Sequence, residues 1–124
     1  MSEPVVASDF IDNKAKIEEV FEFLSMKCFR NSESKGFWKE GINRNKAEMI
    51  ALMHSELSEC LEGIRKGNPA DSHCQNHGSV EIELADTLIR IFDFAGGFNI
   101  NLGEALIAKM IFNLQREKLH GKKF

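Results

Sequence analysis

The sequence predicts an all-α protein. Apolar residues recur at helical spacing along almost the whole chain, and alternating strand patterns are scarce. Only two prolines, Pro4 and Pro69, occur among the 124 residues. Four helical segments joined by short to moderate loops favour a four-helix bundle, which we expect to form a single domain over residues 1–124.

The first helix is expected over residues 12–28. One of its faces carries apolar residues at helical spacing, namely Ile17, Val20, Phe21, Leu24 and Cys28. The next segment, residues 31–45, is rich in Gly, Ser and Asn and therefore predicts a long loop.

The second helix is expected over residues 46–66, with Gly67 directly after its C-terminal cap. Apolar residues fill about half of its circumference. They are Met49, Ile50, Leu52, Met53, Leu57, Cys60, Leu61 and Ile64. Glu56 falls inside this apolar arc and Glu59 falls at its edge, whereas residues 67–78 read as a loop.

The third helix is expected to begin at residue 80, with Ser79 as its N-cap, and to end at Gly96 and Gly97. Most of its circumference is apolar. Glu81 lies in the first turn, where an acid suits the helix dipole. The remaining charged residues fall in one arc of roughly 80°, which contains Glu83, Asp86, Arg90 and Asp93.

The fourth helix is expected to run to about residue 114. Asn101, followed by Glu104 three residues later, resembles a capping pair for its start. The tail, residues 115–124, is basic, and we expect it to be irregular.

The composition excludes several classes of partner. A formal net charge of −3 supplies no basic field for a nucleic acid polymer, and no apolar run approaches the length of about 18 residues that a membrane span needs. The N-terminal residues lack the pattern of a signal peptide. Three cysteines form no paired framework, so we expect a reducing, cytoplasmic environment.

The second and third helices each carry two acids at i, i+3 spacing, Glu56 with Glu59 and Glu83 with Asp86. Carboxylates crowded on an apolar surface repel one another and lose hydration, so they need basic partners or bridging cations. Arg90 alone cannot balance them. Hard oxygen ligands suit Mg²⁺, with Mn²⁺ as the alternative, and the lack of a paired histidine argues against iron. The alternative is that both stripes are ordinary solvent-facing surfaces of amphipathic helices.

These motifs resemble a known family. The segments ELSE, residues 56–59, and ELAD, residues 83–86, are similar to the E-x-x-E…E-x-x-D signature of the all-α nucleoside triphosphate pyrophosphohydrolases. The segments ELADTLIRIFDFA and LGEALIAKMIFNLQRE resemble the MazG-like branch, and the resemblance covers roughly residues 37–123. It implies a bundle of that family's type and Mg²⁺-dependent hydrolysis of nucleoside triphosphates, with deoxynucleotides favoured, to the monophosphate and pyrophosphate in nucleotide-pool house-cleaning.

The same resemblance implies roles for individual residues. By motif position, the metal ligands would be Glu56, Glu59, Glu83 and Asp86. Lys109 and Asn113 match positions that face the nucleotide. Glu59 is our candidate for the general base that orients the attacking water.

Two further residues are candidates for substrate binding. Trp38 precedes the second helix, where the family resemblance implies an aromatic ring that stacks on the nucleobase, with capping of the core as its alternative role. Lys118, in the basic tail, is placed to close over the triphosphate, with a solvated tail as the alternative.

The apolar faces of these helices are larger than a soluble monomer usually exposes, and the family resemblance also implies a homodimer or homotetramer. Two other functions stay open. One is a non-enzymatic helical interaction module, and the other is a related metal-dependent phosphohydrolase that acts on another pyrophosphate.

Overall fold

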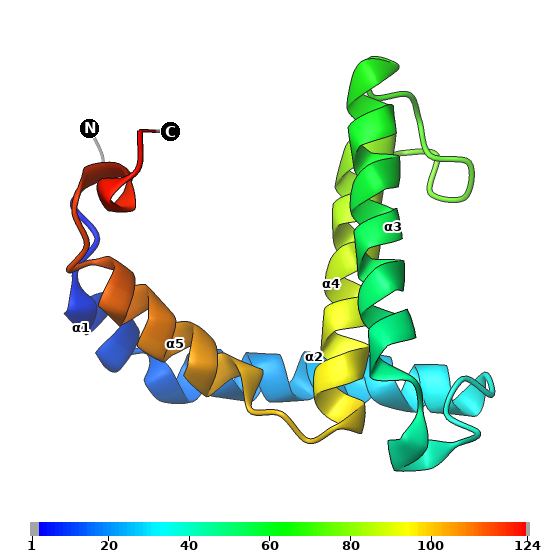
Figure 1. The fold of residues 1–124 in the computed structure, drawn as a ribbon, viewed down its shortest axis with the longest axis horizontal. Helices are drawn as coiled ribbons and strands as arrows, with labels where there is room; N and C mark the ends of the chain where they lie inside the picture. Colours follow the sequence, from blue (N-terminus) through cyan, green and yellow to red (C-terminus); the bar gives the residue numbers. More distant parts are fainter. Residues whose placement is uncertain (1–2, 124) are drawn as a thin grey trace. The chain divides into compact units, whose positions relative to one another are not determined.

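A computed structural model describes residues 3–123 of the chain, without the side chains of Lys118 and His120. The all-α prediction is confirmed, since residues 3–123 contain helices and no strand. The α-helices are α1 (Ala7–Ile11), α2 (Lys14–Ser34), α3 (Lys46–Arg65), α4 (Ser79–Gly97) and α5 (Leu102–Asn113) (Figure 1). Two short 3₁₀ helices, η1 (Gly41–Asn43) and η2 (Lys118–Gly121), lie in the loop before α3 and in the tail.

The chain divides into two compact units. Residues up to Leu24 and from Asn101 form one, which we call the terminal unit, and Ser25–Ile100 form the other, the central unit. The boundary falls within α2. None of the helices in residues 3–123 combines the length and apolar character that a membrane crossing needs.

In the terminal unit, α1 packs against α5 and the first half of α2 passes close to the start of α5. A Cβ atom at Gly103 would lie 3.1 Å from the Cα atom of Glu18, which shows how closely the two backbones approach. The predicted capping pair is confirmed. The Glu104 amide donates to Asn101 Oδ1 at 3.1 Å, and Asn101 Nδ2 donates to Glu104 Oε2 at 3.0 Å.

In the central unit, α3 and α4 lie side by side and run antiparallel (Figure 1). The predicted position of Gly67 after the C-terminal cap of α3 is confirmed, with φ at 78°. Its amide donates to the Ile64 carbonyl at 3.1 Å, and the Asn68 amide donates to the Gly63 carbonyl at 2.7 Å. These two bonds are those of a Schellman motif, which turns the chain towards α4.

The prediction that Ser79 is the N-cap of α4 is wrong, because the cap residue is Gly78 and Ser79 is already helical. The capping group comes from Asn68 instead, whose Oδ1 accepts a hydrogen bond from the Val80 amide at 2.8 Å. Asn68 Nδ2 also donates to Glu81 Oε1 at 3.2 Å. One side chain therefore joins the end of α3 to the start of α4.

The first long helix differs from its prediction. α2 continues to Ser34, past the expected end at residue 28, and shortens the loop before α3. The polar residues at its end have weak helical preference, but the extension begins with Phe29, which packs within the central unit. Phe29 lies against α4, since a Cβ atom at Gly96 would come within 2.8 Å of its Cβ atom, and its ring packs edge-on against Trp38 with centroids 5.2 Å apart. Tertiary packing thus extends the helix beyond its apolar pattern.

Candidate metal centre

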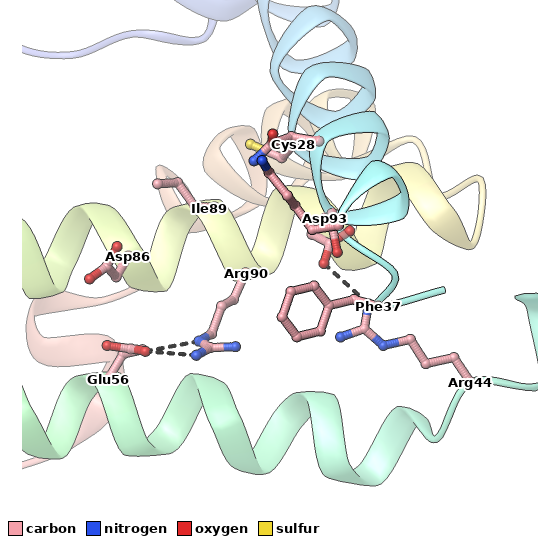
Figure 2. Close-up of a pocket in the computed structure, with 11 residues that line it drawn as sticks. Cys28, Phe37, Arg44, Glu56, Asp86, Ile89, Arg90 and Asp93 are labelled. Carbon is pink, nitrogen blue, oxygen red and sulfur yellow. Dashed lines mark hydrogen bonds and ion pairs between the residues drawn. The ribbon is translucent and has the colours of Figure 1, made fainter. Parts of the chain in front are cut away.

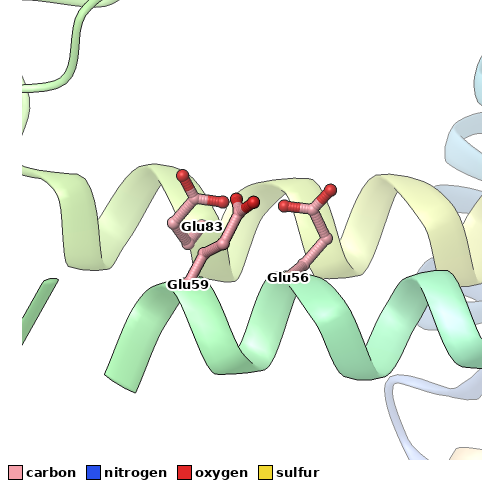
Figure 3. A group of neighbouring side chains, drawn as sticks. All are labelled: Glu56, Glu59 and Glu83. Atoms are coloured by element: carbon pink, nitrogen blue, oxygen red, sulfur yellow. The ribbon is translucent and has the colours of Figure 1, made fainter. Parts of the chain in front are cut away.

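The antiparallel packing of α3 on α4 brings three of the four predicted metal ligands together. One carboxylate oxygen from each of Glu56, Glu59 and Glu83 lies within 4.8 Å of the others (Figure 3). We call these residues the acid group. Glu56 is buried, Glu83 is half-buried and Glu59 is exposed, so the group reaches from the helix interface to solvent. This arrangement can hold a metal ion.

The close approach of the three carboxylates changes the pKa of Glu83 most clearly. Hydrogen bonding with the side chain of Glu56, followed by burial and the proximity of Glu59, raises its pKa from 4.5 to about 8. Its Oε2 atom is buried and has no hydrogen-bond partner. An oxygen of this kind costs free energy until a proton or a cation satisfies it. The acid group is therefore short of positive charge.

Asp86, the fourth predicted ligand, is not a member of the acid group. It lies one turn after Glu83 on α4 and is half-buried. Burial and the neighbouring Glu56 raise the pKa of its carboxyl, whereas Arg90 lowers it. The charge of the acid group thus affects the pKa of Asp86, although Asp86 contributes no oxygen to the group.

Arg90 neutralises part of this charge directly. Its Nη2 lies 2.9 Å and its Nε 3.0 Å from the same oxygen, Oε1 of Glu56 (Figure 2). The Glu56 side chain is 11% exposed and that of Arg90 is 37% exposed, so the pair lies at the edge of the interface. Among the described residues of the α4 stripe, Arg90 is the positive charge.

A cavity of about 330 Å³ adjoins the acid group. Its lining includes charges of both signs, namely Lys35, Arg44, Arg90, Glu56, Asp86 and Asp93 (Figure 2). Phe37, whose surface is 62% exposed, also lines it. A second hollow of about 260 Å³ is lined by Glu59, Glu83 and Lys66. The acid group therefore borders two hollows, both within the central unit.

Asp93, the last acid of the α4 stripe, has a separate role. Its Oδ1 accepts a hydrogen bond from Trp38 Nε1 at 2.9 Å, and its Oδ2 lies 3.3 Å from Arg44 Nη1. The guanidinium of Arg44 lies 4.7 Å from the ring centroid of Trp38. These contacts fasten the loop before α3 onto α4. These contacts are not predictable from the sequence, because the partners are 49 and 55 positions apart and share no local pattern.

Trp38 lies in the core of the central unit and is only 8% exposed. Its ring packs edge-on against Phe29 and Phe98, at centroid distances of 5.2 and 5.1 Å. It does not line the cavity, whereas its neighbour Phe37 does. Stacking of Trp38 on a nucleobase stays a prediction, and its burial favours the alternative role in the core.

The other predicted substrate residues belong to the terminal unit. Lys109 is exposed, and its Nζ lies 4.7 Å from the ring centroid of Phe112. Asn113 has a buried Oδ1 atom with no hydrogen-bond partner. The side chain of Lys118 lies outside the described residues. The roles of all three towards a nucleotide stay predictions.

Comparisons of the chain with protein-family models, with curated proteins and with solved structures return no match. The acid group and the cavity beside it are the features of the central unit that bear on chemistry.

Proposed function

We propose that the protein is a cytoplasmic, Mg²⁺-dependent hydrolase that converts nucleoside triphosphates, preferentially deoxynucleotides, to the monophosphate and pyrophosphate. The observation that carries the proposal is the acid group, in which three carboxylate oxygens from two helices lie within 4.8 Å. The resemblance of the ELSE and ELAD segments to the MazG-like branch supports the choice of substrate.

The donors fit a hard divalent cation. All are carboxylate oxygens, and Glu83 Oε2 is buried without a partner, as expected for a ligand atom awaiting a cation. Glu56, Glu59 and Glu83 would hold Mg²⁺ or Mn²⁺, with Asp86 one turn away as a further ligand. When bound, the cation neutralises carboxylate and phosphate charges and polarises a phosphate oxygen.

The chain's own contribution to the reaction is a positioned base. Glu59 is the exposed member of the acid group, and it would orient a water molecule and take its proton. The water oxygen bonds to phosphorus at the anhydride between the α- and β-phosphates while that P–O bond breaks. The products are the monophosphate and pyrophosphate, one of which carries the water oxygen, and the proton passes to the carboxylate of Glu59.

The cavity of about 330 Å³ beside Glu56 would receive the nucleoside. Its size is at the lower end of the range for small-molecule sites. Phe37 offers an exposed aromatic ring in its lining, and Trp38 would support this wall from the core through Arg44 and Asp93. Lys109, Asn113 and Lys118 are candidates for nucleotide binding through the family resemblance alone.

Exposed apolar surface supports the proposed homodimer or homotetramer. Side chains on α3 and α4 that are 41–59% exposed include Ile50, Leu57, Leu61, Ile64, Leu84, Leu88 and Ile89. Soluble monomers rarely leave so many neighbouring apolar side chains in water. A symmetric contact between copies would cover them.

The decisive experiment is a screen for pyrophosphate release over canonical and modified ribo- and deoxynucleoside triphosphates with Mg²⁺, with the nucleotide product identified. We expect a monophosphate product and loss of turnover in EDTA. Release of orthophosphate with a diphosphate product would contradict the proposal and favour a different phosphohydrolase. No turnover, together with no rise in melting temperature on adding millimolar Mg²⁺, would favour a non-enzymatic helical module.

A further inference from the structure

Within residues 3–123, Glu56 is the member of the acid group that forms an ion pair with a basic side chain. Two nitrogens of Arg90, Nη2 and Nε, lie 2.9 and 3.0 Å from its Oε1 atom, and both belong to one edge of the guanidinium (Figure 2). Glu59 and Glu83 have no such ion pair in the part of the chain described. Arg90 thus neutralises one of the three carboxylates of the acid group.

A divalent cation bound by Glu56 would compete with this arginine. The divalent cation and the guanidinium both interact with the Glu56 carboxylate, and at a separation of a few ångströms the two positive charges repel each other. The Arg90 side chain can move away from Glu56, because it is 37% exposed and lines the cavity of about 330 Å³. After it separates from Glu56, the guanidinium would therefore not be buried in an apolar environment.

The other arginine that lines this cavity, Arg44, already has an acidic partner outside the acid group. Arg44 pairs with the buried Asp93 at 3.3 Å and covers one face of the Trp38 ring, and no acid-group oxygen is its partner. Arg90 is consequently the arginine whose partner a metal ion would take away. A freed guanidinium, with its planar fork of donors, matches phosphate oxygens well.

We propose that Arg90 is an exchangeable counter-ion, which neutralises Glu56 when no metal is bound, releases it when a divalent cation enters, and then binds an anionic oxygen of the substrate. This proposal rests on the proposed function. It assigns a substrate-binding role to a residue outside the predicted ligand set. It also makes metal and nucleotide binding mutually reinforcing, because each favours the arrangement in which Arg90 has left Glu56.

The test uses R90Q in the full-length protein, with R65Q as its control. Arg65 forms an exposed ion pair with Glu62 at 3.7 Å and lies outside the acid group, so R65Q also removes one arginine from an ion pair. Two affinities are measured by calorimetry without turnover. One is for Mn²⁺ alone, and the other is for a non-hydrolysable α,β-imido deoxynucleoside triphosphate in saturating Mg²⁺.

We expect R90Q to bind Mn²⁺ about fivefold or more tightly than the wild type, and to bind the analogue more weakly by a similar factor. R65Q should match the wild type in both. The variant R90K keeps the charge with a single donor group, and should fall between the two proteins in both affinities. It also serves as the test if R90Q fails to fold.

Two results would overturn the inference, and they are distinguishable. If the wild type binds Mn²⁺ but R90Q binds it equally or less tightly, Arg90 is only a structural partner of Glu56 and the metal centre stands. If the wild type itself binds no Mn²⁺ at millimolar concentration, the proposed metal centre fails and the counter-ion role fails with it.

Discussion

The indole N–H of Trp38 donates a hydrogen bond to Asp93 at 2.9 Å, across 55 positions of sequence. The other oxygen of the same carboxylate pairs with Arg44 at 3.3 Å. The loop before α3 is therefore fastened to α4 by one buried acid, which is 8% exposed. This relationship keeps the wall of the cavity in place next to the acid group.

Replacing this acid should destabilise the central unit strongly. Asp93→Ala leaves both the indole N–H and a mostly buried guanidinium without their partner, so we expect the free energy of unfolding to fall by about 3 kcal/mol. Urea denaturation measures the change. Glu62→Ala removes the acid of an exposed pair and should cost less than about 1 kcal/mol. Equal effects of the two substitutions would contradict the anchoring role of Asp93.

Replacing a member of the acid group should separate activity from stability. Glu83→Gln removes a ligand charge, and we expect the turnover of a triphosphate to fall by at least about 100-fold. The apo protein should remain folded and at least as stable at pH 7, since the amide mimics the protonated carboxyl and relieves repulsion. Turnover and thermal melting in EDTA check both points. An unfolded apo variant would show that Glu83 is a structural residue.

The raised pKa of Glu83 predicts a pH dependence of metal binding. Because this pKa is about 8, the carboxyl is mostly protonated at pH 7, and a cation must displace the proton. Mg²⁺ affinity should therefore rise with pH up to about 8 and level off above it. Calorimetry in buffers of different ionisation enthalpy should detect proton release at pH 7. Release that is equally large in Glu83→Gln would point to another group.

The same pKa determines whether the stability of the metal-free protein rises or falls with pH. The folded carboxyl binds its proton more tightly than the unfolded one, since its pKa is raised from 4.5 to about 8. Its contribution to stability is therefore fully present below pH 4.5 and declines as pH rises to about 8. Denaturation in EDTA at several pH values should show a steeper decline for the wild type than for Glu83→Gln. Parallel profiles would argue against this protonation.

The exposed apolar side chains of α3 and α4 predict self-association. Light scattering at micromolar concentration, without metal or nucleotide, should give a mass of at least two chains. Leu88 on α4 is 53% exposed, and Leu88→Glu should shift the protein towards monomer if the contact covers it. A stable wild-type monomer would mean that these faces are not covered by another copy.

The spacing of residues along the chain was enough to predict much of the helical structure of this protein. The 3.6-residue period identified α2, α3, α4 and α5, because apolar side chains gather on one face, but it did not predict the short α1. The same period places acids at i, i+3 spacing on one face of a helix. The Asn101–Glu104 pair and Gly67 were also predictable, because each acts on backbone groups within a few residues. In each case the interacting groups are close along the chain.

Only the tertiary structure decided which acids meet. The register of α4 against α3 places Glu83 beside Glu56 and Glu59 and leaves Asp86 outside the closest set, although both acids belong to one predicted pair. The same register pairs Arg90 with Glu56. Likewise, the turn after α3 brings Asn68, in place of Ser79, to the start of α4. These contacts join residues 12 to 34 positions apart, and helical periodicity does not specify how one helix slides along another.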